Sequence, residues 1–207
     1  MVLSFFEGTH WKPEAFHEPA NIVRLCETLR RLHAIQTVKA QGSEYRRIER
    51  LQESAAMLGL ELPSRIDQYN AKLAHIEQER LNDPRYKPGL AHNDFWANNF
   101  LDDGTNLCLV DWEFSGTGDT LTDLATTAIA GNYSEAEQVA LLTTYGLTEP
   151  SDLDTLQKMK WVVAFFEAMW ALVMHGIRGS GADTSGAGSD YNYWNYAQKM
   201  FERLDVL

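Results

Sequence analysis

The first third of the chain repeats its apolar residues every three or four positions, a spacing typical of amphipathic helices. The pattern predicts a helix over about residues 19–37, a second over about 43–59, and a third that begins after Pro63. Their expected buried faces carry Ile22, Leu25, Leu29, Leu32 and Ile35, then Tyr45, Ile48, Leu51 and Leu58, then Ile66, Tyr69, Leu73, Ile76 and Leu81.

The pattern changes after Asp83-Pro84, where short apolar segments replace the long periodic ones. The segments are residues 89–91, 99–101 and 107–110, and turn residues 102–106 separate the last two. Asp-Gly between two short apolar runs is typical of a β-hairpin. The sequence therefore predicts one small hairpin in the middle of the chain.

Helical patterns return in the last third. Ser134 and Glu137 have the spacing of a capping box, and Gly146 suits the end of the helix that follows. A long helix is expected from Ser151 to about His175, and a final one over residues 190–206. The Gly- and Ser-rich stretch between them predicts a mobile connection. The fold class is therefore mainly α with a small β-hairpin.

The apolar stretch 161–177 holds Glu167 near its centre. A membrane span needs about 20 apolar residues without a central carboxylate, so we expect a buried helix and no membrane span. The N-terminal residues lack the pattern of a signal peptide. Cys26 and Cys108 are too few for a disulfide framework and are expected to be two buried thiols. A cytoplasmic location is expected.

The charge of −11 is concentrated in one segment. Residues 88–157 contain twelve Asp and Glu but no Lys or Arg, and the remainder is nearly neutral. A nucleic-acid binder needs a basic face, so this distribution argues against nucleic acid as a partner. It suits metal ions or a cationic substrate.

The chemistry is expected in the same segment. His92, Asp94 and Asn99 form the pattern H-x-D-x-x-x-x-N, and an apolar strand ending in Asp111 follows, with Glu113 beyond it. Phosphoryl transfer needs a carboxylate that orients and deprotonates the attacking hydroxyl, together with oxygen ligands for Mg²⁺ on the phosphates. The pattern supplies both kinds of group.

These residues resemble the choline/ethanolamine kinase family, within the wider aminoglycoside-phosphotransferase-like kinases. The resemblance rests on the 92–99 pattern, on Val110-Asp-Trp-Glu-Phe-Ser-Gly116 and on the segment 118–125. Residues 165–170 and 191–198 are similar to the helices that close the choline pocket. The resemblance implies an ATP-dependent phosphotransferase that moves the γ-phosphoryl group of ATP to the hydroxyl of a small cationic alcohol such as choline or ethanolamine, with Mg²⁺ as cofactor.

The resemblance also implies a role for each matching residue. Asp94 is the expected catalytic base, and His92 is expected to support it by hydrogen-bonding within the loop. The expected Mg²⁺ ligands are Asn99, Asp111 and Glu113. Asp123 is expected to brace the loop through its backbone, and the residues expected to form an aromatic cage for a quaternary ammonium by cation–π attraction are Trp170, Tyr191 and Tyr196.

Two departures from the family pattern matter. Ala130 stands where eukaryotic choline kinases place a further Glu, which leaves choline itself open. The glycine-rich loop and strand lysine of the N-terminal lobe have no counterpart. The chain therefore resembles a C-terminal lobe without an N-lobe.

Residues 1–8 are expected to be a hinge remnant and 9–207 the helical lobe, with the catalytic loop and metal hairpin at 89–123 and substrate-pocket helices at 150–206. Turnover by the chain alone is expected to be weak.

Two other functions fit parts of the pattern. The missing N-lobe favours a non-catalytic, pseudokinase-like module that binds a cation or a protein partner. His92, Asp94 and Asp111 could instead belong to a metal-dependent hydrolase, although the other histidines show no ligand spacing.

Overall fold

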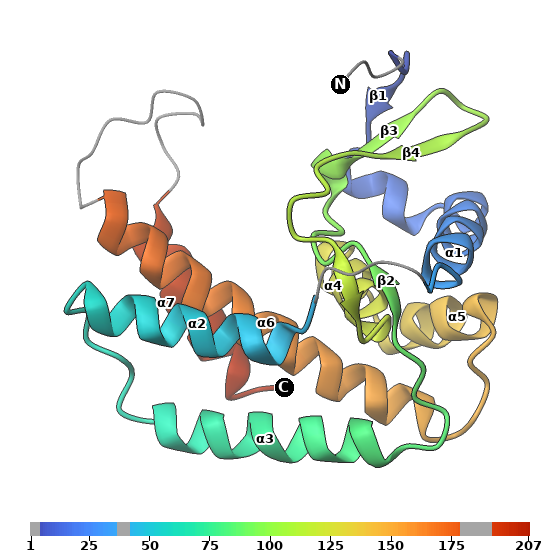
Figure 1. Ribbon diagram of the computed structural model, residues 1–207. Helices are drawn as coiled ribbons and strands as arrows, with labels where there is room; N and C mark the ends of the chain where they lie inside the picture. Colours follow the sequence, from blue (N-terminus) through green and yellow to red (C-terminus); the bar gives the residue numbers. More distant parts are fainter. Residues whose placement is uncertain (1–4, 37–41, 179–191) are drawn as a thin grey trace. The chain divides into compact units, whose positions relative to one another are not determined.

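The computed structural model describes residues 5–36, 42–178 and 192–207. The chain divides into two compact units (Figure 1). The first unit consists of residues 1–43 and 87–160, and the second of residues 44–86 and 161–207. Helix α6 (Asp152–Arg178) contributes its first residues to the first unit and the remainder to the second.

Two small antiparallel sheets belong to the first unit. One has the order β1-β3-β4, and the other pairs β2 with β5. The strands are β1 (Thr9–His10), β2 (Gly89–Ala91), β3 (Phe100–Asp102), β4 (Leu107–Leu109) and β5 (Gly116–Gly118). The predicted hairpin is confirmed as β3–β4, with Leu101 opposite Cys108. The prediction of a single hairpin was incomplete, because it missed β1 and β5.

Three complete helices belong to the same unit: α1 (Pro19–His33), α4 (Leu121–Ala130) and α5 (Glu135–Tyr145). Short 3₁₀ turns occupy Pro13–His17 and Ala97–Asn99. Helix α1 packs against α5 and β2, and its buried face includes Leu25, Cys26 and Leu29. The capping box of α5 is confirmed: Ser134 accepts from the Glu137 amide, and Gly146 ends the helix with φ 104°.

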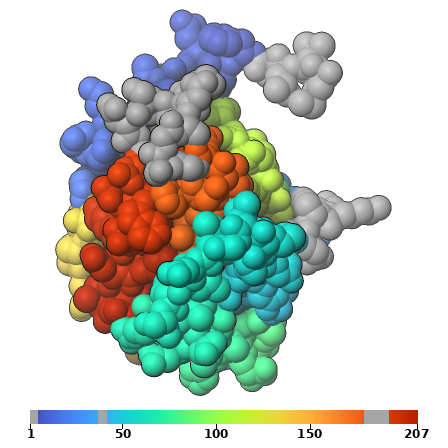
Figure 2. Space-filling model, turned by 90° about the vertical axis from the view of Figure 1, so that its left-hand side faces the viewer, coloured from blue at the N-terminus to red at the C-terminus, as the bar shows by residue number. Residues whose placement is uncertain are grey.

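The second unit is built from α2 (Glu44–Met57), α3 (Ile66–Asn82), the larger part of α6, and α7 (Tyr193–Leu204). Aromatic rings form its core, since Tyr69 packs edge-on against Trp161 and Phe165 and stacks on Phe201. The Arg47 guanidinium lies 4.0 Å from the centroid of the Phe166 ring. Figure 2 shows one face of this unit, with α7 in red beside the α2–α3 segment in teal. An apolar hollow of about 370 Å³ lies between residues 61–63 and α7.

The prediction of buried helix faces was wrong for three of the apolar residues assigned to them. Ile35, Leu58 and Leu81 are 42%, 44% and 57% exposed. Ile35 and Leu58 lie just beyond the ends of α1 and α2, where the helical periodicity no longer applies, and Leu81 lies in the last turn of α3. The prediction of two buried thiols was correct for Cys26, whereas Cys108 is only partly buried.

Helix α6 is, among the described residues, the one helix long and apolar enough to cross a membrane. Of its most apolar stretch, 67% is buried inside the protein. Trp161, Phe165 and Met169 are almost completely enclosed. Packing in a protein core therefore accounts for the apolar composition, as the sequence predicted.

Candidate functional site

The 92–99 loop connects β2 to β3 and brings Asn99 onto Asp94. The side-chain amide of Asn99 donates to the Asp94 carboxylate at 2.7 Å and to the Asp94 backbone carbonyl at 2.8 Å. Asn99 is buried and Asp94 is half-buried. A buried amide that donates twice to one residue restricts the carboxylate to a defined orientation.

Asp111 is fixed beside this loop by the residue that precedes it. The Val110 amide donates to the Asn99 carbonyl at 3.0 Å, and the Val110 carbonyl accepts from His92 Nε2 at 3.0 Å. Asp111 itself has φ 63°, in the left-handed region that Asp tolerates better than most residues. The chain turns sharply there, and the Asp111 side chain is exposed.

His92 supports the loop from inside the protein. Its side chain is completely buried, and Nε2 carries the proton because it faces a carbonyl oxygen. The ring also packs against Phe95 and Trp112. An enclosed ring whose Nε2 is hydrogen-bonded to the backbone disfavours the hydrolase alternative, which needs His92 as a metal ligand.

Asp123 in α4 accepts two backbone amides of the loop. The His92 amide donates to Oδ2 and the Asn93 amide to Oδ1, each at 2.8 Å. The carboxylate is completely buried, so it needs these donors to offset its lost hydration. The bracing role that the resemblance implies for Asp123 stays a prediction.

Residues that the sequence did not single out complete this arrangement. His33 Nε2 lies 3.0 Å from Asp123 Oδ2, and His33 Nδ1 lies 2.7 Å from the Tyr145 hydroxyl. Asn93 adopts φ 63° and donates its side-chain amide to the carbonyls of Phe114 and Gly42. These partners are about 20 to 110 positions apart in the sequence, so no local pattern identifies them.

The donor set suits a hard divalent cation. The Asn99 amide nitrogen is directed to Asp94, and its carbonyl oxygen accepts from the Asn98 side chain at 3.3 Å, which leaves one lone pair for a ligand. Asp111 and Glu113 present exposed carboxylates. Within the described residues no three His, Cys, Asp or Glu side chains gather as a metal site. Mg²⁺ in phosphoryl-transfer sites is commonly held by one or two carboxylates with substrate phosphates and water, so the residues present fit this ion.

The second unit carries an α6–α7 aromatic cluster, consisting of Trp170, Tyr193, Tyr196 and Glu167. The rings of Trp170 and Tyr193 are 5.7 Å apart, and the Tyr196 hydroxyl donates to Glu167 at 3.1 Å. The Arg178 guanidinium lies 5.2 Å from the Tyr193 ring centroid, so this ring already contacts a cation. Trp170 and Tyr196 were predicted, Tyr193 and Glu167 were not, and Tyr191 lies outside the described residues.

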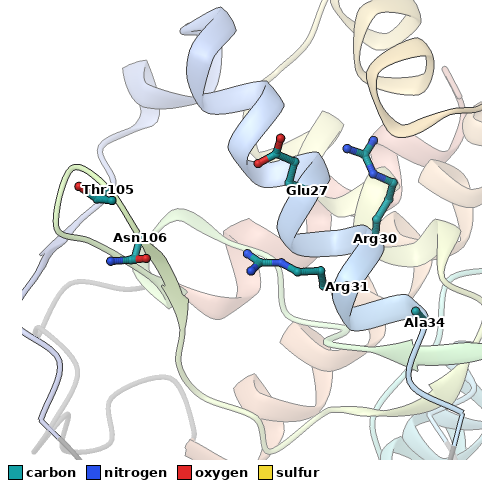
Figure 3. Close-up of a pocket in the computed structure, with 6 residues that line it drawn as sticks. All are labelled: Glu27, Arg30, Arg31, Ala34, Thr105 and Asn106. Carbon is teal, nitrogen blue, oxygen red and sulfur yellow. The ribbon is translucent and has the colours of Figure 1, made fainter.

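A separate hollow of about 620 Å³ lies between α1 and the tip of the β3–β4 hairpin (Figure 3). Arg31 extends from α1 toward the hairpin, whereas Arg30 is turned away and donates to the Thr144 carbonyl at 2.5 Å. Glu27 and Asn106 also line the hollow. None of the predicted site residues contributes to it, so it is distinct from the 92–99 loop.

Residues 1–161 match the model of the phosphotransferase enzyme family. The chain belongs to this family. No curated protein sequence gives a significant match. The match covers the 92–99 loop, Asp111, Glu113 and Asp123, and it ends before the α6–α7 aromatic cluster.

Solved structures of this family have the same fold. A choline/ethanolamine kinase family protein from Mesorhizobium loti is 22% identical with a TM-score of 0.79, over 96% of this chain and 66% of that one. The choline kinase LicA from Streptococcus pneumoniae is 17% identical with a TM-score of 0.73, over 97% and 68%. The aminoglycoside phosphotransferase APH(2")-IIa, in a complex with streptomycin and ATP, is 16% identical with a TM-score of 0.56, over 98% and 69%.

These similarities confirm the family and the fold that the sequence predicted. The chain spans just under two thirds of the Mesorhizobium loti protein. It is therefore a partial, C-lobe-like version of the fold.

Proposed function

We propose that this phosphotransferase is an ATP-dependent kinase of the choline/ethanolamine type, which transfers the γ-phosphoryl group to the hydroxyl of a small cationic alcohol. The contact that carries this proposal is the 2.7 Å hydrogen bond from the Asn99 amide to the Asp94 carboxylate. Asp94 is only half-buried, so part of this residue is exposed to solvent.

Asp94 acts as the base for the acceptor hydroxyl. A carboxylate in this position accepts the hydroxyl hydrogen bond, aligns the oxygen with the phosphorus atom and takes the proton as the new bond forms. The Asn99 amide holds it in place, and Asp123 holds the backbone on which it is carried. In this arrangement the protein contributes to catalysis mainly by positioning the reacting groups, as expected for phosphoryl transfer.

Magnesium would be held by Asp111 and the Asn99 carbonyl oxygen, with Glu113 assisting. When bound, the ion neutralises charge on the phosphate oxygens. The exposed carboxylate of Asp111 and the buried amide of Asn99 are connected through Val110, so the two ligands are carried on one hydrogen-bonded segment.

The acceptor class rests on the α6–α7 aromatic cluster. Aromatic faces attract quaternary or protonated amines, and a nearby carboxylate strengthens that attraction. Trp170, Tyr196 and Glu167 supply these groups, whereas Tyr191 lies outside the described residues. ATP is proposed as phosphoryl donor because family structures contain AMP or ATP, as in LicA with AMP and APH(2")-IIa with ATP.

The test is a transfer assay on the purified chain with choline, ethanolamine, an aminoglycoside and thiamine as acceptors. Asp94→Asn keeps the size of the side chain and removes the base, so it should reduce transfer by at least about a hundred-fold. Asp103→Asn is the matched control, because Asp103 is an exposed turn residue that binds its own hairpin amides. Full transfer by Asp94→Asn would overturn the assigned role, and tight acceptor binding without transfer would favour a non-catalytic module.

A further inference from the structure

The 92–99 loop is anchored to the helices of the first unit at one buried carboxylate. Asp123 accepts hydrogen bonds from the amides of His92 and Asn93 and from the side chain of His33. Oδ2 receives two of these donors and Oδ1 receives one. Asp94 directly follows the two anchored residues, so the orientation of the Asp123 carboxylate determines the position of the backbone at Asp94.

We propose that His33 is a positioning residue for phosphoryl transfer, because it fixes the Asp123 carboxylate and, through it, the backbone that carries Asp94. The proposal rests on the proposed function. It adds a residue of α1 to the machinery of the loop, although His33 is about 60 positions away from Asp94 in the sequence.

The hydrogen bond between His33 and Asp123 lies in a buried place. The side chains of His33 and Asp123 are 4% and 0% exposed, so water does not replace a lost donor at that site. A buried carboxylate that loses one of three donors is partly unsatisfied and gains freedom to rotate. Rotation about its χ2 angle would move Oδ1 and Oδ2 away from the two amides together, which loosens the loop at the residue before the base.

His33 is itself held in one orientation by Tyr145 at the end of α5. The Tyr145 hydroxyl lies 2.7 Å from His33 Nδ1, and their rings are 5.7 Å apart. Burial raises the pKa of Tyr145, so its hydroxyl keeps the proton that it donates to His33. The Nε2 proton of His33 is then directed to Asp123. The hydrogen bonds run from α5 through α1 and α4 to the loop.

Four variants separate positioning from general stability. His33→Leu removes both ring nitrogens, and His33→Gln retains one amide donor at about the reach of Nε2. Tyr145→Phe removes only the hydroxyl that orients His33. Tyr133→Phe is its matched control, since Tyr133 is another tyrosine of the first unit, but its hydroxyl donates to the Phe16 carbonyl and not to this chain of bonds.

The primary measurement is amide hydrogen exchange by NMR on the full 207-residue chain. We expect exchange at the His92 and Asn93 amides to accelerate about ten- to a hundred-fold in His33→Leu, less in Tyr145→Phe, and to return close to wild type in His33→Gln. Tyr133→Phe should leave these two amides unchanged. Equal exchange at His92 and Asn93 in wild type, His33→Leu and Tyr145→Phe would overturn the proposal.

Transfer kinetics give the second measurement. A positioning role predicts that His33→Leu lowers kcat by about ten-fold or more with little change in KM, and that His33→Gln restores most of it. An unchanged kcat in folded His33→Leu would overturn the proposal. If the wild type transfers no phosphate at all, the proposed function fails, whereas the exchange result still decides whether His33 fixes the loop.

Discussion

Asn99 donates its side-chain amide to the carboxylate of Asp94 at 2.7 Å, so a neutral group and not a second carboxylate lies beside the proposed base. Asn99→Asp should therefore raise the pKa of the coupled pair, since two adjacent carboxylates do not ionise independently. We expect the acidic limb of the pH profile of kcat/KM to move upward by about one pH unit or more. Asn98→Asp adds the same charge at an exposed neighbouring residue and should move the acidic limb much less. Identical profiles for both variants would contradict the close coupling.

The β3–β4 hairpin is tied to α1 by Asp102. Its carboxylate accepts two hydrogen bonds from Arg24, at 2.8 and 2.6 Å, and one from the Trp11 indole. The hydrogen bond from Arg24 is the main reason why the pKa of Asp102 lies well below its ordinary value. The ionised carboxylate of Asp102 therefore stabilises the folded protein fully above the pKa that Asp102 has in the unfolded chain, and this stabilisation is lost as pH falls.

Asp102→Asn should accordingly lower the free energy of unfolding by about 2 kcal/mol at pH 7. The difference from wild type should stay constant above about pH 5 and shrink below about pH 4. Urea denaturation across this range measures it. Arg46→Gln, which breaks half-exposed ion pairs with Glu49 and Glu77, is the control and should cost less than about 1 kcal/mol. A difference that grows toward low pH would be the wrong sign for this explanation.

The start of α5 offers a direct test of a capping interaction. Ser134→Ala removes the acceptor for the Glu137 amide, and we expect a loss of about 1 kcal/mol in the free energy of unfolding. Glu135→Ala changes the same helical turn outside the capping box and should lower the free energy of unfolding by only a few tenths of about 1 kcal/mol. Chemical denaturation of both variants checks the ranking, which equal losses would refute.

Gly89 is expected to be the more sensitive of two contrasting glycines. A Cβ atom at Gly89 would lie 2.3 Å from the His33 carbonyl, so Gly89→Ala must displace β2 or α1. Gly104 has φ 89° but open space around it, so Gly104→Ala pays only the backbone penalty of about 1–2 kcal/mol. Thermal and urea unfolding should show the larger loss for Gly89→Ala, and the reverse order would contradict the close approach.

The two thiols should differ in reactivity. Burial raises the pKa of Cys26 to about 12, so it holds almost no thiolate at pH 8, whereas Cys108 is partly exposed. Labelling with an aromatic disulfide at pH 8 should titrate one thiol in the native protein and two in denaturant. Rapid labelling of both native thiols would show that Cys26 is not enclosed.

The sequence identified the elements with a clear hydrophobic period and missed those without one. Helix α4 was missed because nearly every residue in it is buried, from Leu121 to Ile129, so it has no polar face to reveal a helical repeat. Strand β1 is two residues long and exists only through its pairing with β3. Such pairings are fixed by tertiary contacts, and local patterns do not determine them.

The same division holds for the site. His92, Asp94, Asn99 and Asp111 are close in sequence, and their spacing was sufficient to place them in one segment. His33 has no metal-ligand spacing to another histidine, and its contacts to Asp123 and Tyr145 are 90 and 112 positions away, so no local pattern identifies it. Asp102 was expected to be a turn residue only, and its bond to Arg24 likewise depends on a distant helix.

The most direct test of the central claim is ³¹P NMR of the purified chain with ATP, Mg²⁺ and a panel of cationic alcohols. The account predicts a phosphomonoester resonance that requires an acceptor and disappears in Asp94→Asn. Release of inorganic phosphate alone, or a phosphomonoester that forms equally well in Asp94→Asn, would contradict it.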